Sequence, residues 1–300
     1  TWADRAKIIV NSVCGDMDGT KNNLMEADDR AQLTKYIEDF KFMPGGRYIW
    51  YGGRDARFFN NCYLLRLEED SREAWAGLSQ RAMSCLMTGG GIGVDVSRCR
   101  PSGRALRRTG GIASGPLPLL YTLNEIGRNV MQGGSRRSAL YGSMDAGHGD
   151  IWELLHAKNW FNTPIEGSEL SIADAKKFNF NYHAPLDMMN ISLNYSDEWL
   201  NGGQDDIFME NCRQALMTGE PGFSFNFGDK KNETLRNACT EITSEDDSDV
   251  CNLGSVNLAN IETPEDFKDV VHLASKFLVC GLIRAHLPYE KVEKVRQQNS

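Results

Sequence analysis

The sequence lacks several features that would place it in a specialised class of protein. It has eight cysteines in 300 residues, but no two form a Cys-x-x-Cys pair, which argues against a structural zinc site. Their wide scatter does not match the disulfide framework of a secreted protein, so a reducing cytoplasm is the simplest setting. No apolar run approaches the ~18 residues that a membrane-spanning helix needs, and the chain opens without the basic and apolar start of a signal peptide.

Acidic residues outnumber basic ones, with 41 Asp and Glu against 33 Lys and Arg. The formal net charge is -8, which argues against a protein that grips a nucleic-acid backbone. Charged residues make up 25% and hydrophobic residues 41% of the chain, as in an ordinary globular protein that can bury a substantial core. The sequence has no repeat at a fixed period. It also has no initiator methionine, so either that residue is removed or the chain is a fragment.

Apolar periodicity predicts helices and strands that alternate from residue 44 onward. This alternation is typical of an α/β protein. Residues 1–40 look helical and carry no motif, so we expect a first segment that ends there. The helices are expected at 31–40, 72–87, 117–130, 151–158, 206–218, 264–283 and 288–298, and the strands at 61–67, 92–96, 140–144, 191–193, 223–227 and 255–258.

A thiol between an amide and a carboxyl group is the most informative local pattern. In extended backbone, side chains two residues apart point the same way, so Asn237, Cys239 and Glu241 would share one face. A thiol beside a proton acceptor is a candidate reactive centre, and Cys251 lies close by in sequence. The alternative is a small apolar cysteine buried in a strand, which is where free cysteines often lie.

Two other patterns suggest sites that their context does not support. The glycines of 89–93 resemble a dinucleotide-binding turn, but that turn needs a strand before it and a helix after it, and here the order is reversed. The acidic stretch 244–249 could bind a metal ion. A solvated hairpin tip is the preferred interpretation of that stretch.

Segment 237–241, followed by Cys251-Asn252-Leu253, resembles the active-site loop of ribonucleotide reductases. The resemblance implies an α/β fold: residues 41–300 would form the N-terminal part of a ten-stranded barrel, with the C-terminal part absent, and the helical segment 1–40 would precede it. Further stretches resemble the same family in the same order, from about residue 40 to the end: Pro44-Gly45-Gly46-Arg47, Asn60-Asn61-Cys62-Tyr63, Thr88-Gly89-Gly90-Gly91-Ile92-Gly93, Thr109-Gly110-Gly111-Ile112-Ala113-Ser114-Gly115-Pro116 and Arg136-Arg137-Ser138-Ala139-Leu140.

The resemblance implies a role for each residue of the motif. Cys239 would become the thiyl radical that removes the 3′-hydrogen of a ribonucleotide, and Glu241 would be the general base. Cys62 and Cys251 would supply the electrons and close as a disulfide. Ala238 stands where many relatives have proline. The substrate-binding residues that the resemblance implies are Asn61, Cys62, Gly103, Asn237, Ala238, Cys239, Thr240 and Glu241.

Two basic segments resemble the loops through which dNTP effectors control specificity in this family. The first is 97–103, with Arg100 in it and Gly103 near the substrate. The second contains Arg136 and Arg137. The alternative for both is a solvated basic loop.

The spacing of Cys239 and Cys251 resembles that of adenosylcobalamin-dependent members of the family. The resemblance implies a thioredoxin-like or dithiol reductant and, because residues 96–116 hold no large insertion, a homodimer. No resident metal ion is implied, and part of the cofactor's site would lie in the absent C-terminal part. Two alternatives stay open: a class I catalytic subunit with a separate radical-generating protein, and a truncated fragment without activity.

Overall fold

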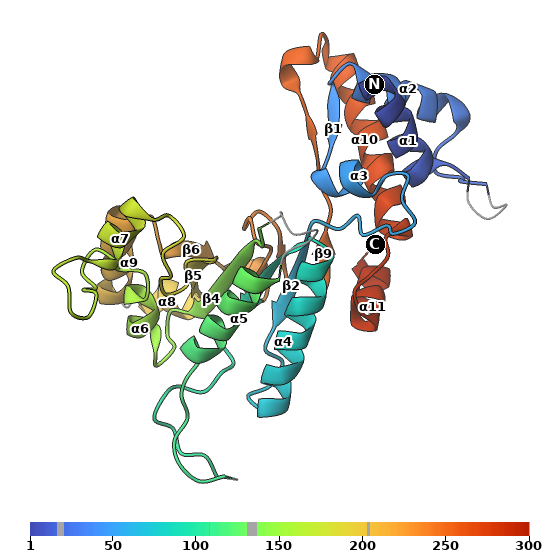
Figure 1. The fold of residues 1–300 in the computed structure, drawn as a ribbon. Coiled ribbons are helices and arrows are strands. Elements are labelled where there is room, and N and C mark those ends of the chain that lie inside the picture. Colours follow the sequence, from blue (N-terminus) through green and yellow to red (C-terminus); the bar gives the residue numbers. More distant parts are fainter. Residues whose placement is uncertain (17–20, 108, 131–136, 203–204, 300) are drawn as a thin grey trace. The chain divides into compact units, whose positions relative to one another are not determined.

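The computed structural model describes residues 1–16, 21–107, 109–130, 137–202 and 205–299 (Figure 1). The chain divides into two compact units. Unit 1 holds residues 1–62 and 250–293, and unit 2 holds residues 63–249 and the residues from Lys294 on. The chain leaves unit 1 within strand β2 (Cys62–Arg66) and returns within β9 (Asp249–Cys251). The expected boundary at residue 40 therefore does not coincide with a boundary between compact units.

Unit 1 is built on three packed helices, α1 (Trp2–Cys14), α2 (Ala27–Glu38) and α10 (Pro264–Arg284) (Figure 1). Thr1 begins α1 with a capping box, in which its side chain accepts a hydrogen bond from the Asp4 N–H. The core between the helices is fully buried and includes Ile9, Leu33 and Phe277. The shorter elements of this unit are β1 (Phe42–Pro44), α3 (Gly46–Tyr51), β10 (Gly254–Val256), η2 (Leu258–Asn260) and the start of α11 (Glu290–Asn299).

Unit 2 contains most of a six-stranded sheet, in the order β6-β5-β4-β3-β2-β9. Strands β3, β4, β5 and β6 of this sheet run parallel to one another, and this confirms the α/β class. The remaining small strands, β7 (Leu235–Arg236) and β8 (Thr243–Ser244), pair as an antiparallel hairpin. The parallel strands are β3 (Gly91–Asp95), β4 (Leu140–Asp145), β5 (Met189–Tyr195) and β6 (Gly222–Phe225).

Helices of unit 2 follow the strands in the chain, as parallel pairing requires. Two of them, α4 (Arg72–Met87) and α5 (Leu117–Asn129), lie side by side and pack on β3 and β4 respectively (Figure 1). Ser71 begins α4 by accepting a hydrogen bond from the Ala74 N–H. The other helices are α6 (Ile151–His156), α7 (Ile172–Phe178), α8 (Asp197–Gly202), α9 (Asp205–Thr218) and the short η1 (Gly228–Lys230).

The expected elements appear with small changes at their ends. The predicted helix 72–87 is confirmed residue for residue, and the predicted strand 191–193 is longer, from Met189 to Tyr195. The predicted helix 31–40 includes Phe40, but α2 ends at Glu38. Phe40 has a φ of 56° and is exposed, because the chain turns there toward β1.

The acidic stretch 244–249 is not the solvated hairpin tip that its charge predicts. Asp247 is buried, forms an ion pair with Arg81 and accepts a hydrogen bond from the Arg66 N–H at 2.6 Å. Ser248 is fully buried and donates its N–H to the Leu64 carbonyl oxygen at 2.7 Å. The ion pair with Arg81 and the hydrogen bonds to the backbone of β2, all distant in sequence, therefore keep Asp247 and Ser248 buried. In the described residues, no helix combines the length and the apolar composition that crossing a bilayer requires.

Candidate functional site

Cys239 lies in a tight turn between β7 and β8. The turn is closed by the Asn237 N–H, which donates to the Ile242 carbonyl oxygen at 3.3 Å, and by the Thr240 N–H, which donates to the Asn237 carbonyl oxygen at 3.0 Å. Cys239, Thr240 and Glu241 are exposed, whereas Asn237 and Ala238 are buried. The turn therefore presents a thiol and a carboxyl group to solvent.

The turn corrects one premise of the sequence analysis. Extended backbone would place Asn237, Cys239 and Glu241 on one face, but Thr240 has a φ of 69°, in the left-handed region. Asn237 also points inward, and its Oδ1 accepts a hydrogen bond from the Ile242 N–H at 3.1 Å. Cys239 and Glu241 share exposure because they lie in the same turn, and Asn237 shapes that turn from inside.

The glycines before and within β3 allow this hairpin to lie against the sheet. A Cβ atom on Gly93 would lie 2.8 Å from the Arg236 carbonyl carbon and even closer to its oxygen. A Cβ atom on Gly91 would lie 2.9 Å from the Ala238 Cβ atom. Thr234, just before β7, donates its hydroxyl to Asp95 at 2.7 Å. The glycine-rich segment thus serves close backbone packing on the Cys239 turn, and it follows helix α4 and runs into strand β3.

The two other motif cysteines lie in adjacent segments of unit 1. The Asn61 N–H donates to the Cys251 carbonyl oxygen at 2.8 Å, so the residue before Cys62 is hydrogen-bonded to Cys251. Both cysteines are buried, with 4% exposure at Cys62 and 7% at Cys251. Cys62 and Cys251, which are far apart in the sequence, therefore lie on the neighbouring strands β2 and β9.

A third motif supports the same place in unit 1. The Gly45 N–H donates to the Leu253 carbonyl oxygen at 2.9 Å, and a Cβ atom on Gly45 would lie 3.2 Å from Asn61 Oδ1. That oxygen is buried and has no hydrogen-bond partner in the described part of the chain. Asn252 donates its amide to the Tyr48 hydroxyl at 2.7 Å. The Pro-Gly-Gly-Arg, Asn-Asn-Cys and Cys-Asn-Leu motifs therefore meet in the folded unit.

The first basic loop lines a pocket of about 940 Å³ in unit 2. The loop continues as a small hairpin, in which the Gly103 N–H donates to the Ala113 carbonyl oxygen at 2.9 Å. Three arginines line the pocket together with the ring of Trp75: Arg72, Arg100 and Arg107. Two of the arginines are paired with lining carboxylates, Arg72 with Glu73 and Arg100 with Asp70. The pocket thus combines cationic side chains, of which Arg107 has no such pair among the described residues, with an aromatic ring.

Asp70, like Arg72, Trp75 and Arg107, lines this pocket without having been predicted from the sequence. It forms an ion pair with Arg100 and also accepts a hydrogen bond from the Arg100 N–H at 3.1 Å. In the sequence it follows Glu68 and Glu69 and looks like part of a solvated acidic run, so no local signal distinguishes it. Cys99 also lines the pocket, and its burial, together with Asp70 and Asp150, raises the pKa of its thiol to about 12. Cys99 is therefore protonated at neutral pH and is not the nucleophile of this pocket.

Of the second basic loop, Arg137 is described, whereas Arg136 lies outside the described residues. The Arg137 guanidinium lies 5.3 Å from the centre of the Phe180 ring and donates to Asn181 Oδ1 at 3.3 Å. The Lys176 ammonium also lies over the Phe180 ring, 5.8 Å from the ring centre. Phe180 and Asn181, which follow α7, therefore contact Arg137.

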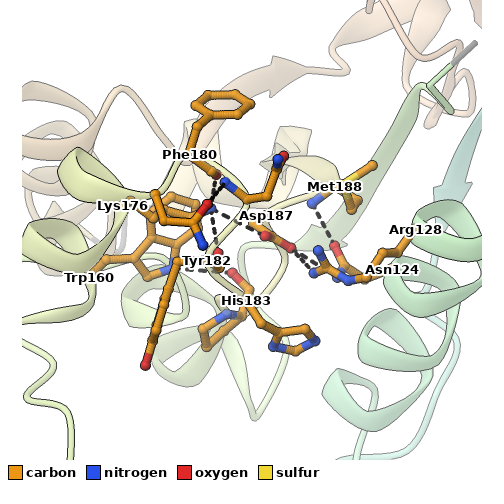
Figure 2. A network of polar contacts seen from close by, with 12 residues as sticks. Asn124, Arg128, Trp160, Lys176, Phe180, Tyr182, His183, Asp187 and Met188 are labelled. Carbon is orange, nitrogen blue, oxygen red and sulfur yellow. Dashed lines mark hydrogen bonds and ion pairs between the residues drawn. The ribbon is translucent and has the colours of Figure 1, made fainter. Parts of the chain in front are cut away.

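Figure 2 shows the polar network around Lys176 and Asp187, in which Asp187 lies between Lys176 and Arg128. Asp187 pairs with both cations and lies near the Asn124 amide, which is 3.4 Å away. Burial by itself raises the pKa of Asp187, but the hydrogen bonds from Arg128 and Asn124 lower that pKa by more. The net pKa lies below its usual value, so the carboxyl group stays ionised. Because Arg128 belongs to the last turn of α5, the network holds the chain just before the second loop.

A comparison with protein families decides the identity of this arrangement. The family model for the ribonucleotide reductase barrel domain matches residues 60–201 and 204–300, more than half of the chain. The chain belongs to the ribonucleotide reductase family. The sequence resemblance is thereby confirmed, and the sheet of unit 2 is part of a ribonucleotide reductase barrel domain.

Curated relatives of the same family are similar at modest identity. A vitamin B12-dependent ribonucleoside-diphosphate reductase of Mycobacterium tuberculosis is 26% identical over 242 residues, which cover 75% of this chain and 33% of that relative. A protein of the same name from Thermoplasma acidophilum is 24% identical, with 88% and 36% covered. The ribonucleoside-diphosphate reductase subunit alpha of Chlamydia muridarum is 24% identical, with 74% and 25% covered. The chain thus spans about a third of the length of the first relatives it matches.

Proposed function

We propose that this chain carries the radical and redox cysteines of a ribonucleotide reductase, which converts ribonucleoside di- or triphosphates to 2′-deoxyribonucleotides. The observation that carries the proposal is the turn at Cys239, which presents one exposed thiol next to the exposed carboxyl group of Glu241. A thiol that abstracts a hydrogen atom from a substrate has to be accessible, and among the eight cysteines, all of them in the described residues, Cys239 is the one classed as exposed.

In this proposal Cys239, as a thiyl radical, removes the 3′-hydrogen atom of the ribose and returns it after the 2′-carbon has been reduced, so that the thiyl radical is regenerated. Glu241 accepts the proton of the 3′-hydroxyl group, and its exposure in the same turn supports this role. Asn237 orients the turn and the substrate together with Ala238 and Thr240. Asn61 offers a buried oxygen without a described partner as a further hydrogen-bond acceptor, and Gly103 is assigned to the substrate side of the first loop.

The electrons come from Cys62 and Cys251. Their two thiols release two electrons and two protons as the S–S bond forms, while the 2′-hydroxyl group leaves as water and hydrogen takes its place. The hydrogen bond between Asn61 and Cys251 supports a pair that can close. A thioredoxin-like protein or a small dithiol then reduces the disulfide by exchange.

We assign adenosylcobalamin as the radical source. Two of the relatives are named vitamin B12-dependent, and the exposed Cys239 can be approached by a group that other residues hold. When bound, that group would supply the radical chemistry, and Cys239 would be the thiol that gives up its hydrogen atom. The alternative, a class I subunit with a radical-generating partner, predicts no change in the cobalamin spectrum when substrate and dithiol are added.

The pocket at Arg100 is proposed as the site of a dNTP effector. Arg107 and Arg72 suit phosphate groups, and Trp75 offers a ring to stack on. Arg136 and Arg137 would then transmit the identity of the effector to the substrate site, and a homodimer would be the assembled form. Binding of a dNTP to the chain, measured by calorimetry, tests this part independently of catalysis.

The decisive experiment places Cys239→Ser in a complete catalytic subunit that contains this sequence. We expect deoxynucleotide formation to fall to background while substrate binding stays within about twofold, because an alcohol cannot replace the thiyl radical. Cys85→Ser, at a fully buried core cysteine, is the matched control and should keep activity. Turnover above background by Cys239→Ser would disprove the assignment.

A further inference from the structure

Arg236, directly before Asn237, makes contacts that the proposed chemistry does not account for. Its backbone belongs to β7, which packs on Gly93 of β3, while its side chain reaches β6. The Nε atom donates to Ser224 Oγ at 2.6 Å. The terminal nitrogen donates to the Phe225 carbonyl oxygen and to Asn226 Oδ1, both at 3.3 Å.

The acceptors of Arg236 are themselves fixed. Ser224 is 1% exposed and Asn226 is 2% exposed. The Asn226 amide lies 3.3 Å from the Ser224 carbonyl oxygen, and the Asn226 N–H donates to the Tyr195 carbonyl oxygen of β5 at 3.0 Å. The guanidinium therefore binds to a rigid point at the end of the parallel sheet.

These acceptors are uncharged oxygens, so the pattern is not that of an ordinary surface ion pair. A guanidinium presents its donors in a planar fork, and this fork meets three acceptors in fixed directions. Hydrogen bonds from a charged donor to buried acceptors are also stronger than neutral ones. The contacts thus fix the direction of β7 rather than neutralise a charge.

We propose that Arg236 is a positioning residue for the Cys239 turn, because its side chain clamps β7 to the end of β6. The proposal rests on the proposed role of Cys239. The turn is then held at both faces of β7, by Gly93 against its backbone and by Ser224, Phe225 and Asn226 around its side chain. The thiol three residues further on is placed by this clamp.

Hydrogen exchange on the chain itself tests the clamp without any assumption about activity. In Arg236→Met we expect the amides of 237–242 to exchange about tenfold faster, because the turn opens more often, while the amides of β4 change less than about twofold. Arg236→Lys should restore only part of the protection, because its donors radiate from one point. Arg213→Met, at an exposed arginine of α9, is the control and should leave both regions unchanged. Unchanged exchange at 237–242 in Arg236→Met would overturn the proposal.

A second variant covers the case in which Arg236→Met loosens β4 as well. Ser224→Ala removes a single acceptor, and we expect about threefold faster exchange at 237–242 with β4 unchanged. No change in this variant would also overturn the clamp.

Activity of the complete subunit distinguishes the clamp from the proposed function. Arg236→Met should lower kcat about tenfold or more with KM within about twofold, because a displaced thiol reacts slowly without losing substrate contacts. A higher KM at unchanged kcat would contradict positioning. If the unsubstituted subunit makes no deoxynucleotide, the proposed function fails, and the exchange result alone decides whether Arg236 holds the turn.

Discussion

Replacement of Gly93 by alanine should displace the Cys239 turn and destabilise unit 2. The new Cβ atom would lie 2.8 Å from the Arg236 carbonyl carbon and 3.2 Å from the Asn237 carbonyl carbon. Ordinary contacts between carbon atoms are about 3.5–4.0 Å, so β7 has to retreat by about 1 Å. Both atoms belong to backbone, which cannot rotate away as a flexible side chain can.

The magnitude follows from two opposing effects. Overpacking of this kind costs about 1–3 kcal/mol. Alanine restricts the unfolded chain more than glycine does and returns about 0.4–1 kcal/mol. We therefore expect a net loss of about 1–2 kcal/mol in the free energy of unfolding, and about 100-fold lower turnover in a complete subunit, since a shift of about 1 Å has that effect on reacting groups.

Urea denaturation of the whole chain measures the first effect, and Gly77→Ala provides the matched control. Gly77 lies inside α4, and a Cβ atom there would meet nothing within 4 Å. Alanine is favoured over glycine in a helix by about 0.5–1 kcal/mol, so this variant should be more stable than the parent. The two glycine-to-alanine changes are thus expected to shift the midpoint in opposite directions. A Gly93→Ala variant as stable as the parent would refute the close packing of β7 on β3.

Three further outcomes are expected. Oxidation by a small-molecule disulfide should form a disulfide bond between Cys62 and Cys251. The number of thiols that can be alkylated should then fall by two, and a dithiol should restore both. A peptide map that shows a different cysteine pair would contradict this prediction. Asp187→Asn should lower the free energy of unfolding by about 2–3 kcal/mol at pH 7, because two cations lose their partner. The pKa of Asp187 is lowered on folding, so this contribution is present above about pH 4 and disappears as pH falls through the lower folded value; a difference that does not change with pH would sink the explanation. Arg107→Ala should weaken dNTP binding about tenfold in calorimetry, and unchanged affinity would exclude this pocket as the effector site.

Local periodicity was sufficient for most elements of the fold. The helix 72–87 has apolar residues at helical spacing, a serine before it and glycines after it, and each of these signals acts within a few residues. Strand β5 was underestimated because its first residues are paired with Leu140 and Tyr141 of β4, which a local pattern does not reveal. The division into units was equally invisible, because α10 joins α1 across most of the chain.

The sequence by itself determined which chemical groups the proposed function uses: the amide, thiol and carboxyl group of Asn237, Cys239 and Glu241 in unit 2, and the thiols of Cys62 and Cys251 in unit 1. Tertiary structure alone decided how they are presented. The Asn237 side chain points inward and accepts a hydrogen bond from the Ile242 N–H. Cys62 and Cys251 lie on neighbouring strands because their two segments are hydrogen-bonded to each other. Hydrogen bonds and packing between segments distant in sequence set these positions, and no local propensity contains that information.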